Sequence, residues 1–129
     1  MSTVATLVYP EEFEFLRCLY GSPGNASPRF RFPDLISACV SVVFDSFANP
    51  EERIFQFLST TLTDRNKGGR PACRKEEIWN PQFFPLRELQ GSKENRHPNP
   101  GWQLGDFTTA CVALVMSSAR PPAAAASGL

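Results

Sequence analysis

The residues most able to do chemistry lie together in one basic stretch, residues 64–75 (DRNKGGRPACRK). Guanidinium and ammonium groups beside a thiol favour its thiolate form, so the sequence predicts a lowered pKa for Cys73. The same cations could bind phosphate or an acidic protein face, or only be solvated. Both a reactive and an idle Cys73 fit the sequence. We take as a candidate contact loop the five basic residues of this stretch, Arg65, Lys67, Arg70, Arg74 and Lys75.

Elsewhere the sequence shows no catalytic pattern. Its one histidine, His97, lies in a polar loop, and a nucleophile pair with Cys73 would rest on residue types alone. The acidic residues occur as adjacent pairs, and two of these pairs stand at expected helix starts, where carboxylates complement the helix dipole. Neither a phosphate-cradling glycine pattern nor a zinc-ligand spacing is present. We therefore expect no catalytic residue, no metal and no cofactor, and an enzymatic or redox role through Cys73 is the weakest of our hypotheses.

A larger pattern determines where these residues stand, because residues 9–44 (the first segment) recur as residues 79–116 (the second segment). Thirteen aligned positions are identical across one two-residue gap, where roughly two would match by chance. The identical pairs are Phe13/Phe83, Leu16/Leu86, Arg17/Arg87, Leu19/Leu89, Gly21/Gly91, Ser22/Ser92, Asn25/Asn95, Pro28/Pro98, Asp34/Asp106, Ala38/Ala110, Cys39/Cys111, Val40/Val112 and Val43/Val115. We expect an internal duplication of a helix, loop, short strand and helix, with pseudo-two-fold symmetry around one shared core.

Each segment is expected to open with a short helix. In the first segment Pro10 suits a first helical turn, apolar residues follow at helical spacing, and Gly21 ends the helix. In the second segment Pro85 interrupts the same pattern, so we expect a shorter helix that starts near Pro85 and ends at Gly91. We interpret the Gly-Ser-x-x-Asn sequence after each helix as turn chemistry, with the glycine in a left-handed cap and the asparagine bonded to the backbone.

Short strands are expected next. Residues 29–32 and residues 101–104 alternate polar and apolar side chains, which is typical of a half-buried strand. Each run has only four residues and would be marginal alone. We therefore expect the two runs to pair with one another.

A long apolar stretch follows each of these runs, residues 35–46 in the first segment and residues 107–118 in the second. We interpret the preceding Asp34 and Asp106 as helix N-caps and each stretch as a buried helix. A core strand is the alternative, because β-branched residues are frequent and periodicity does not distinguish the two in a continuous apolar run.

One comparison with known folds concerns residues 29–62, which run strand, helix, turn, helix. This order and length resemble the ribbon-helix-helix DNA-binding domains. The resemblance implies that two such strands pair and place outward side chains in the major groove, with Arg29, Arg31 and Gln103 contacting base edges. It also implies that four side chains face the core, namely Phe30, Phe32, Trp102 and Leu104. DNA binding through the paired strands is therefore our second functional hypothesis.

Length and composition fit one domain. The chain has 129 residues, of which 42% are hydrophobic, and we place the domain in residues 1–119. Residues 49–78 should supply a bridging helix over residues 50–63 and then the basic loop. We expect residues 120–129 to be a disordered Ala/Pro tail.

Charge and hydropathy bear on partners and location. The net charge is zero, but the first 64 residues hold four basic and eight acidic residues, so the excess of basic residues lies in the rest of the chain. Such asymmetry can steer self-association or a partner. No apolar run approaches the roughly 18 residues of a membrane span and no basic signal region opens the chain, so we expect an intracellular, cytoplasmic protein without membrane contact. The sequence predicts a mainly helical α+β fold and a non-enzymatic module that binds a protein partner or a second copy.

Overall fold

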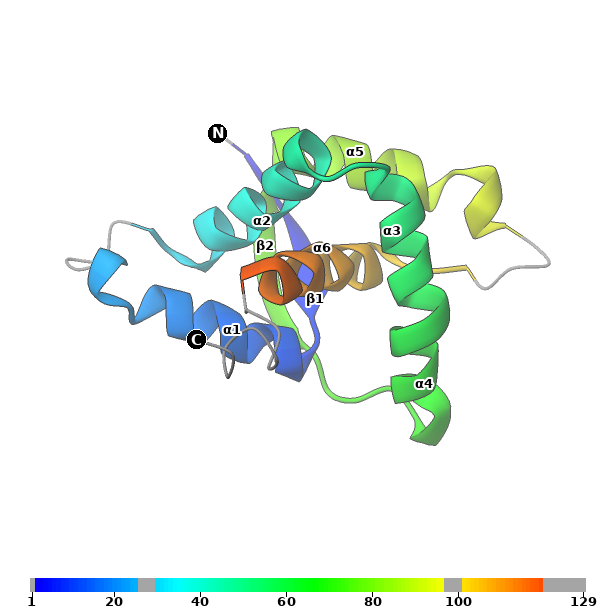
Figure 1. Ribbon diagram of the computed structural model, residues 1–129, viewed down its shortest axis with the longest axis horizontal. Helices are drawn as coiled ribbons and strands as arrows, with labels where there is room; N and C mark the ends of the chain where they lie inside the picture. Colours follow the sequence, from blue (N-terminus) through cyan, green and yellow to red (C-terminus); the bar gives the residue numbers. More distant parts are fainter. Residues whose placement is uncertain (1, 26–29, 97–100, 120–129) are drawn as a thin grey trace, which may run out of the picture.

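A computed structural model describes residues 2–25, 30–96 and 101–119. The protein is mainly helical with one two-stranded antiparallel sheet, so the expected α+β class is confirmed (Figure 1). In chain order the main elements are β1 (Thr3–Val8), α1 (Pro10–Tyr20), α2 (Phe32–Ser46), α3 (Pro50–Phe57), α4 (Thr63–Arg65), β2 (Arg74–Trp79), α5 (Asn80–Gln90) and α6 (Leu104–Ala119). Short 3-10 turns, Pro23–Asn25 and Lys93–Asn95, follow α1 and α5. The order strand, helix, 3-10 turn, helix therefore occurs twice.

The sheet joins the N-terminal strand to a strand from the middle of the chain. β1 and β2 pair antiparallel, from Thr3 opposite Trp79 to Val8 opposite Arg74. α6 packs on β1 and α2 packs on β2 (Figure 1). Val8 and Ile78 are fully buried. The two helices thus supply the apolar cover without which a two-stranded sheet is only marginally stable.

The strand pair predicted from residues 29–32 and 101–104 is wrong. Phe32 is the first residue of α2 and Leu104 is the first residue of α6. The described residues just before these helices are not strands either, and Arg29 lies outside the described residues. The sheet forms instead between the two six-residue strands that precede α1 and α5.

Asparagine side chains, rather than a partner strand, form hydrogen bonds with the backbone just before α2 and α6. The Asn25 amide donates to the carbonyl of Phe30, and its oxygen accepts from the Phe30 N–H. Asn95 makes the same two bonds with Trp102. The prediction that these asparagines bond to the backbone is therefore confirmed. The glycine that begins each Gly-Ser-x-x-Asn turn has a φ of −88° or −91°, so the expected left-handed cap is wrong.

The long apolar stretches are helices, α2 and α6, and the strand alternative is excluded. Asp34 and Asp106 are not N-caps but the third residues of these helices. Each carboxylate accepts a backbone N–H from just before the helix, Arg31 N–H at 3.0 Å and Gln103 N–H at 2.9 Å. A carboxylate at this position still satisfies an otherwise unpaired N–H and complements the helix dipole, which is why the sequence pattern resembles a cap.

The shorter helices agree with the sequence in one segment and differ in the other. α1 begins at Pro10 and ends before Gly21, as predicted. α5 contains Pro85 in its interior, so the prediction of a helix starting near that proline is wrong. Proline removes one backbone hydrogen bond, and the burial of Leu86 and Leu89 on the same helix offsets this loss.

The predicted bridging helix is present and contributes to the core. α3 continues through a π-helical turn, Leu58–Leu62, into α4. Ile54, Leu58 and Leu62 are fully buried, and both α3 and the π-helical turn pack against α6.

α2 and α6 pack against each other in the core, where Cys39 and Cys111 are buried as free thiols. Burial raises the pKa of Cys39 to about 12. Burial also raises the pKa of Cys111, and the neighbouring Cys39 adds to this effect. Both thiols therefore stay neutral and pack as small apolar side chains.

α6 approaches β1 closely at Gly105. A Cβ at this position would lie 2.8 Å from the Cβ of Leu7 and 3.2 Å from both the N and the O of Leu7. Because two of these are backbone atoms of the strand, a larger side chain would force the helix and the strand apart.

We expect Gly105→Ala to lower the free energy of unfolding by about 1–3 kcal/mol, because the added methyl group overpacks the helix–strand contact. Urea denaturation followed by tryptophan fluorescence measures the effect. Gly101→Ala is the matched control, because a Cβ there would meet nothing within 4 Å, and its effect should stay below about 0.5 kcal/mol. Equal stability of the two variants would contradict the close approach of α6 to β1.

Candidate functional site

The five basic residues of the predicted contact loop lie on four successive parts of the chain. Their places are the end of α4 (Arg65), the 3-10 turn Asn66–Gly68 (Lys67), the loop that follows (Arg70) and β2 (Arg74 and Lys75). Lys67 pairs with the exposed Asp64 at 3.3 Å. The guanidinium of Arg74 lies over the ring of Phe13, 4.3 Å from its centre. Most of these cations therefore contact groups of the chain itself.

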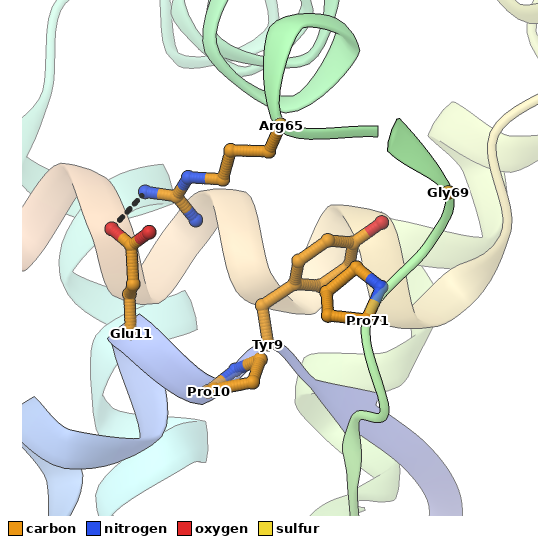
Figure 2. A pocket seen from close by; sticks show the side chains of 6 residues that line it. All are labelled: Tyr9, Pro10, Glu11, Arg65, Gly69 and Pro71. Carbon is orange, nitrogen blue, oxygen red and sulfur yellow. Dashed lines mark ion pairs between the residues drawn. The ribbon is translucent and has the colours of Figure 1, made fainter. Parts of the chain in front are cut away.

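Arg65 forms one wall of a small cavity (Figure 2). Its guanidinium pairs with Glu11 at 3.0 Å and with Glu12 at 2.7 Å, and the Glu12 side chain is fully buried. The cavity has a volume of about 260 Å³ and is lined by Tyr9, Pro10, Glu11, Arg65, Gly69 and Pro71. Arg65 therefore pairs with both carboxylates beside the cavity, one positive charge against two negative charges.

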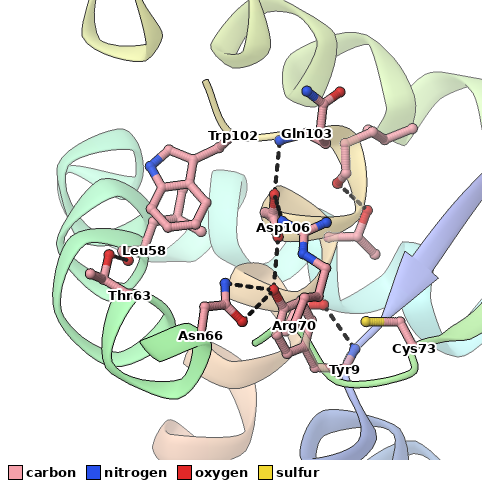
Figure 3. Close-up of polar contacts among 12 residues, drawn as sticks. Tyr9, Leu58, Thr63, Asn66, Arg70, Cys73, Trp102, Gln103 and Asp106 are labelled. Atoms are coloured by element: carbon pink, nitrogen blue, oxygen red, sulfur yellow. Dashed lines mark hydrogen bonds and ion pairs between the residues drawn. The ribbon is translucent and has the colours of Figure 1, made fainter. Parts of the chain in front are cut away.

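A buried carboxylate organises the neighbouring polar contacts (Figure 3). The guanidinium of Arg70 donates to both oxygens of Asp106 at 3.0 Å, and the Tyr9 hydroxyl lies 3.2 Å from one of them. The Asn66 amide donates to the Tyr9 oxygen at 3.0 Å. Burial raises the pKa of Tyr9, the hydrogen bond from Asn66 opposes this shift, and the charge of Asp106 adds to it. The tyrosine is therefore a neutral donor, and the network anchors the loop at the start of α6.

The thiol of Cys73 is not activated by its basic neighbours. The side chain is half-buried, and its sulfur lies 3.5 Å from the carbonyl of Pro71. Burial raises the pKa of this thiol, and the charges of Asp106 and Glu12 raise it further, although Arg70 lowers it. The predicted lowering of this pKa is wrong, because desolvation and nearby carboxylates outweigh the cations that flank Cys73 in the sequence.

A second aromatic residue makes the same kind of contact at the start of α2. The Trp79 indole N–H donates to Asp34 at 2.8 Å, and the Trp79 backbone N–H donates to the hydroxyl of Ser37 at 3.0 Å. The Tyr9 backbone N–H donates in the same way to the hydroxyl of Thr109 at 3.1 Å. The first turns of α2 and α6 are thus held by equivalent contacts.

The two places differ in what surrounds the carboxylate. Asp106 is paired with Arg70, whereas Asp34 has no basic partner among the described residues. A groove of about 580 Å³ opens beside Asp34 and is lined by Phe30, Asp34, Leu35, Ser37, Ala38, Ser41, Trp79 and Gln82. The groove therefore combines apolar side chains with one carboxylate.

Apolar side chains continue from this groove along α2. We call Phe30, Leu35, Ala38 and Val42 the α2 face. Phe30 is 52% exposed and Val42 is 41% exposed, so the expectation that Phe30 faces the core is wrong. The aligned residues of the second segment, Trp102, Phe107, Ala110 and Leu114, are buried or half-buried. The difference arises because α3 packs against α6, with the ring of Phe55 edge-on to Phe107 at 5.6 Å.

The residues expected to contact DNA are not brought together by a strand pair. Arg31 and Gln103 are exposed, and each directly precedes a helix. Arg29 lies outside the described residues, as does His97.

Sequence reasoning missed the groove, because residues 35–46 were interpreted as buried all round. The available signal was the spacing of Leu35, Ala38 and Val42, which places three apolar residues on one side of a helix. The sequence does not show that this side of the helix is accessible to solvent, because that depends on which side packs against the core.

Comparison with protein-family models, with curated proteins and with solved structures found no match for this chain. Within residues 2–25, 30–96 and 101–119, no helix has both the length and the apolar character needed to cross a membrane. The same residues contain no group of His, Cys, Asp and Glu side chains that could hold a metal ion. Functional inference therefore rests on the geometry of the α2 face and its groove.

Asp106→Ala should lower the free energy of unfolding by about 3 kcal/mol, because it removes the buried partner of Arg70 and of Tyr9. Asp34→Ala should lower it by only about 1 kcal/mol, because this carboxylate loses hydrogen bonds from neutral donors but no ion pair. Chemical denaturation of both variants gives the comparison. Equal losses would show that Arg70 does not stabilise the fold through Asp106.

The four cysteines should differ in reactivity toward a short pulse of iodoacetamide at pH 8. Cys18 is exposed and should react first, Cys73 should react more slowly, and the buried Cys39 and Cys111 should stay unlabelled. Peptide mass spectrometry reports each site, and labelling in denaturant is the control in which all four react. Labelling of Cys73 ahead of Cys18 would restore the hypothesis of an activated thiol.

Proposed function

We propose that this protein is a non-enzymatic binding module that contacts another protein, or a second copy of itself, through the α2 face and its groove. The observation that carries the proposal is the unequal cover of two matching helices. The matching apolar side chains of the second segment are buried or half-buried where α3 packs against α6, whereas those of the α2 face are exposed or half-buried. Exposed apolar side chains gathered beside a groove are typical of protein-interaction sites.

The proposal includes an internal duplication, which makes the two helices comparable. Thr6 of β1 stands opposite Glu76 of β2, and these residues are 70 positions apart in the sequence. Tyr9 and Trp79, which make equivalent contacts, are separated by the same 70 positions. Equivalent residues stand directly opposite one another where a two-fold axis crosses an antiparallel pair, so this register supports pseudo-two-fold symmetry.

The other functions have less support. Glu11 and Glu12 beside the small cavity are paired with Arg65, and burial raises the pKa of Cys73, so neither place offers an activated catalytic group. DNA binding through strands at residues 29–32 and 101–104 loses its basis, because the described residues of these two segments do not form a strand pair.

Selection of peptides from a random phage-display library against the full-length protein tests the proposal. We expect peptides that bind wild-type protein and bind at least about ten-fold more weakly to Ala38→Trp. The indole in that variant fills the groove from an exposed helical position, so it should leave the core unchanged. Sedimentation equilibrium of the wild type and the same variant tests self-association through this face.

The matched control is Ala48→Trp, which adds the same side chain at an exposed position between α2 and α3. Peptide affinity and oligomeric state should be unchanged in this control. Peptides that bind all three proteins equally, together with a monomer at every concentration, would overturn the proposal.

A further inference from the structure

The segment that packs over α6 shows which kind of element could pack against the α2 face. α3 lies against α6 with Phe55 edge-on to Phe107, and Ile54 and Leu58 are fully buried. The opposite side of α3 carries exposed charged residues. The covering element is therefore an amphipathic helix.

The same covering segment also brings an arginine. Beyond α4 the chain turns back, and Arg70 reaches both oxygens of Asp106 at 3.0 Å (Figure 3). The Asp106 side chain is fully buried, so this ion pair is only partly open to water. An ion pair of this kind sets the register of the segment as well as adding to its stability.

The α2 face offers the same two features, and no helix of the part of the chain that the structure describes covers it as α3 covers α6. Leu35, Ala38 and Val42 present apolar side chains that are exposed or half-buried. Each oxygen of Asp34 accepts one neutral N–H, and no basic side chain among the described residues pairs with it. A guanidinium would therefore find at Asp34 the partner that Arg70 finds at Asp106.

A second copy of this chain is a poor source of a covering helix. A second copy has a suitable helix, α3, but lifting it from its own α6 would expose Ile54 and Leu58. A helix from a different protein would leave Ile54 and Leu58 buried, so we take such a helix as the occupant.

We infer that the α2 face receives an amphipathic helix of a partner protein, followed by an extended stretch whose arginine pairs with Asp34. The arrangement repeats the way in which α3 and Arg70 cover α6 and Asp106. This inference rests on the proposed function and adds the chemistry of the partner.

The probe is a phage-display library built on residues 50–71 of this chain, which already combine the helix and the arginine. Positions 54, 55, 58 and 62 are randomised, and position 70 is either arginine or glutamine. The target is the full-length protein. We expect the selected peptides to keep arginine at position 70 and apolar residues at the randomised positions. Their binding should weaken about ten-fold on Ala38→Trp.

A double-mutant cycle then tests the ion pair. Asp34→Asn in the protein and citrulline for arginine in the best peptide should each weaken binding about ten-fold, and together no more than either alone. The matched control is Asp45→Asn, which removes an exposed acid from the same helix and should leave affinity unchanged. Citrulline leaves the protein untouched, so this arm is informative even if Asp34→Asn unfolds the chain.

The outcomes separate this inference from the proposed function. Peptides that need Ala38 but tolerate both Asp34→Asn and citrulline would overturn the arginine pairing and leave the binding face in place. Peptides indifferent to Ala38→Trp would count against both. Binding that appears only after Arg120→Ala would assign the face to residues 120–129, and a dimer lost in Ala38→Trp would assign it to a second copy. Either result would overturn the inference of a different protein.

Discussion

Two aromatic residues, each bonded to a helix from the other sequence segment, hold this fold together. Tyr9 follows β1 and contacts Asp106 at the start of α6, while Trp79 follows β2 and contacts Asp34 at the start of α2. In each case the backbone N–H of the aromatic residue also donates to a hydroxyl one turn along the same helix. These bonds join the two segments at both helix starts, and they pair polar groups of Tyr9 and Trp79 that would be costly to bury unpaired.

The asymmetry of the molecule follows from the presence of one bridging segment and two matching helices. α3 and the loop carrying Arg70 lie against α6, so the carboxylate and apolar side chains on that helix are buried. Nothing comparable covers α2 within the described residues, where Phe30 and Val42 are exposed. The proposed binding face is thus the side of α2 that no described element covers as α3 covers α6.

The basic stretch illustrates how a sequence pattern can mislead about chemistry. Five cations in twelve residues predict an exposed contact loop and an activated Cys73. In the folded chain Arg65 and Arg70 are paired with carboxylates from distant elements, and burial raises the pKa of the Cys73 thiol. These two arginines connect parts of the fold, because each forms an ion pair with an acidic residue that lies far away in the sequence. Such partners depend on tertiary contacts, which residue types alone do not reveal.

Local interactions alone were enough for the sequence to determine the helices and the turns. Helical spacing predicted α1 and α3, the preceding aspartates favoured helices at α2 and α6, and the Gly-Ser-x-x-Asn pattern identified the asparagines that bond to the backbone. These features depend on hydrogen bonds within a few residues, so a single segment contains the information. Local interactions do not determine α5, because the packing of this helix outweighs the helix-breaking effect of Pro85.

Only the tertiary structure decided which strands pair, which side of α2 meets solvent and which pKa values shift. β1 and β2 pair although about 70 residues separate them in the sequence, and neither strand contains a local pattern that identifies its partner strand. The exposure of Leu35, Ala38 and Val42 depends on α3 packing against α6 rather than against α2. The candidate binding face is therefore a product of long-range packing, because burial belongs to the assembled fold and not to the order of residues in one segment.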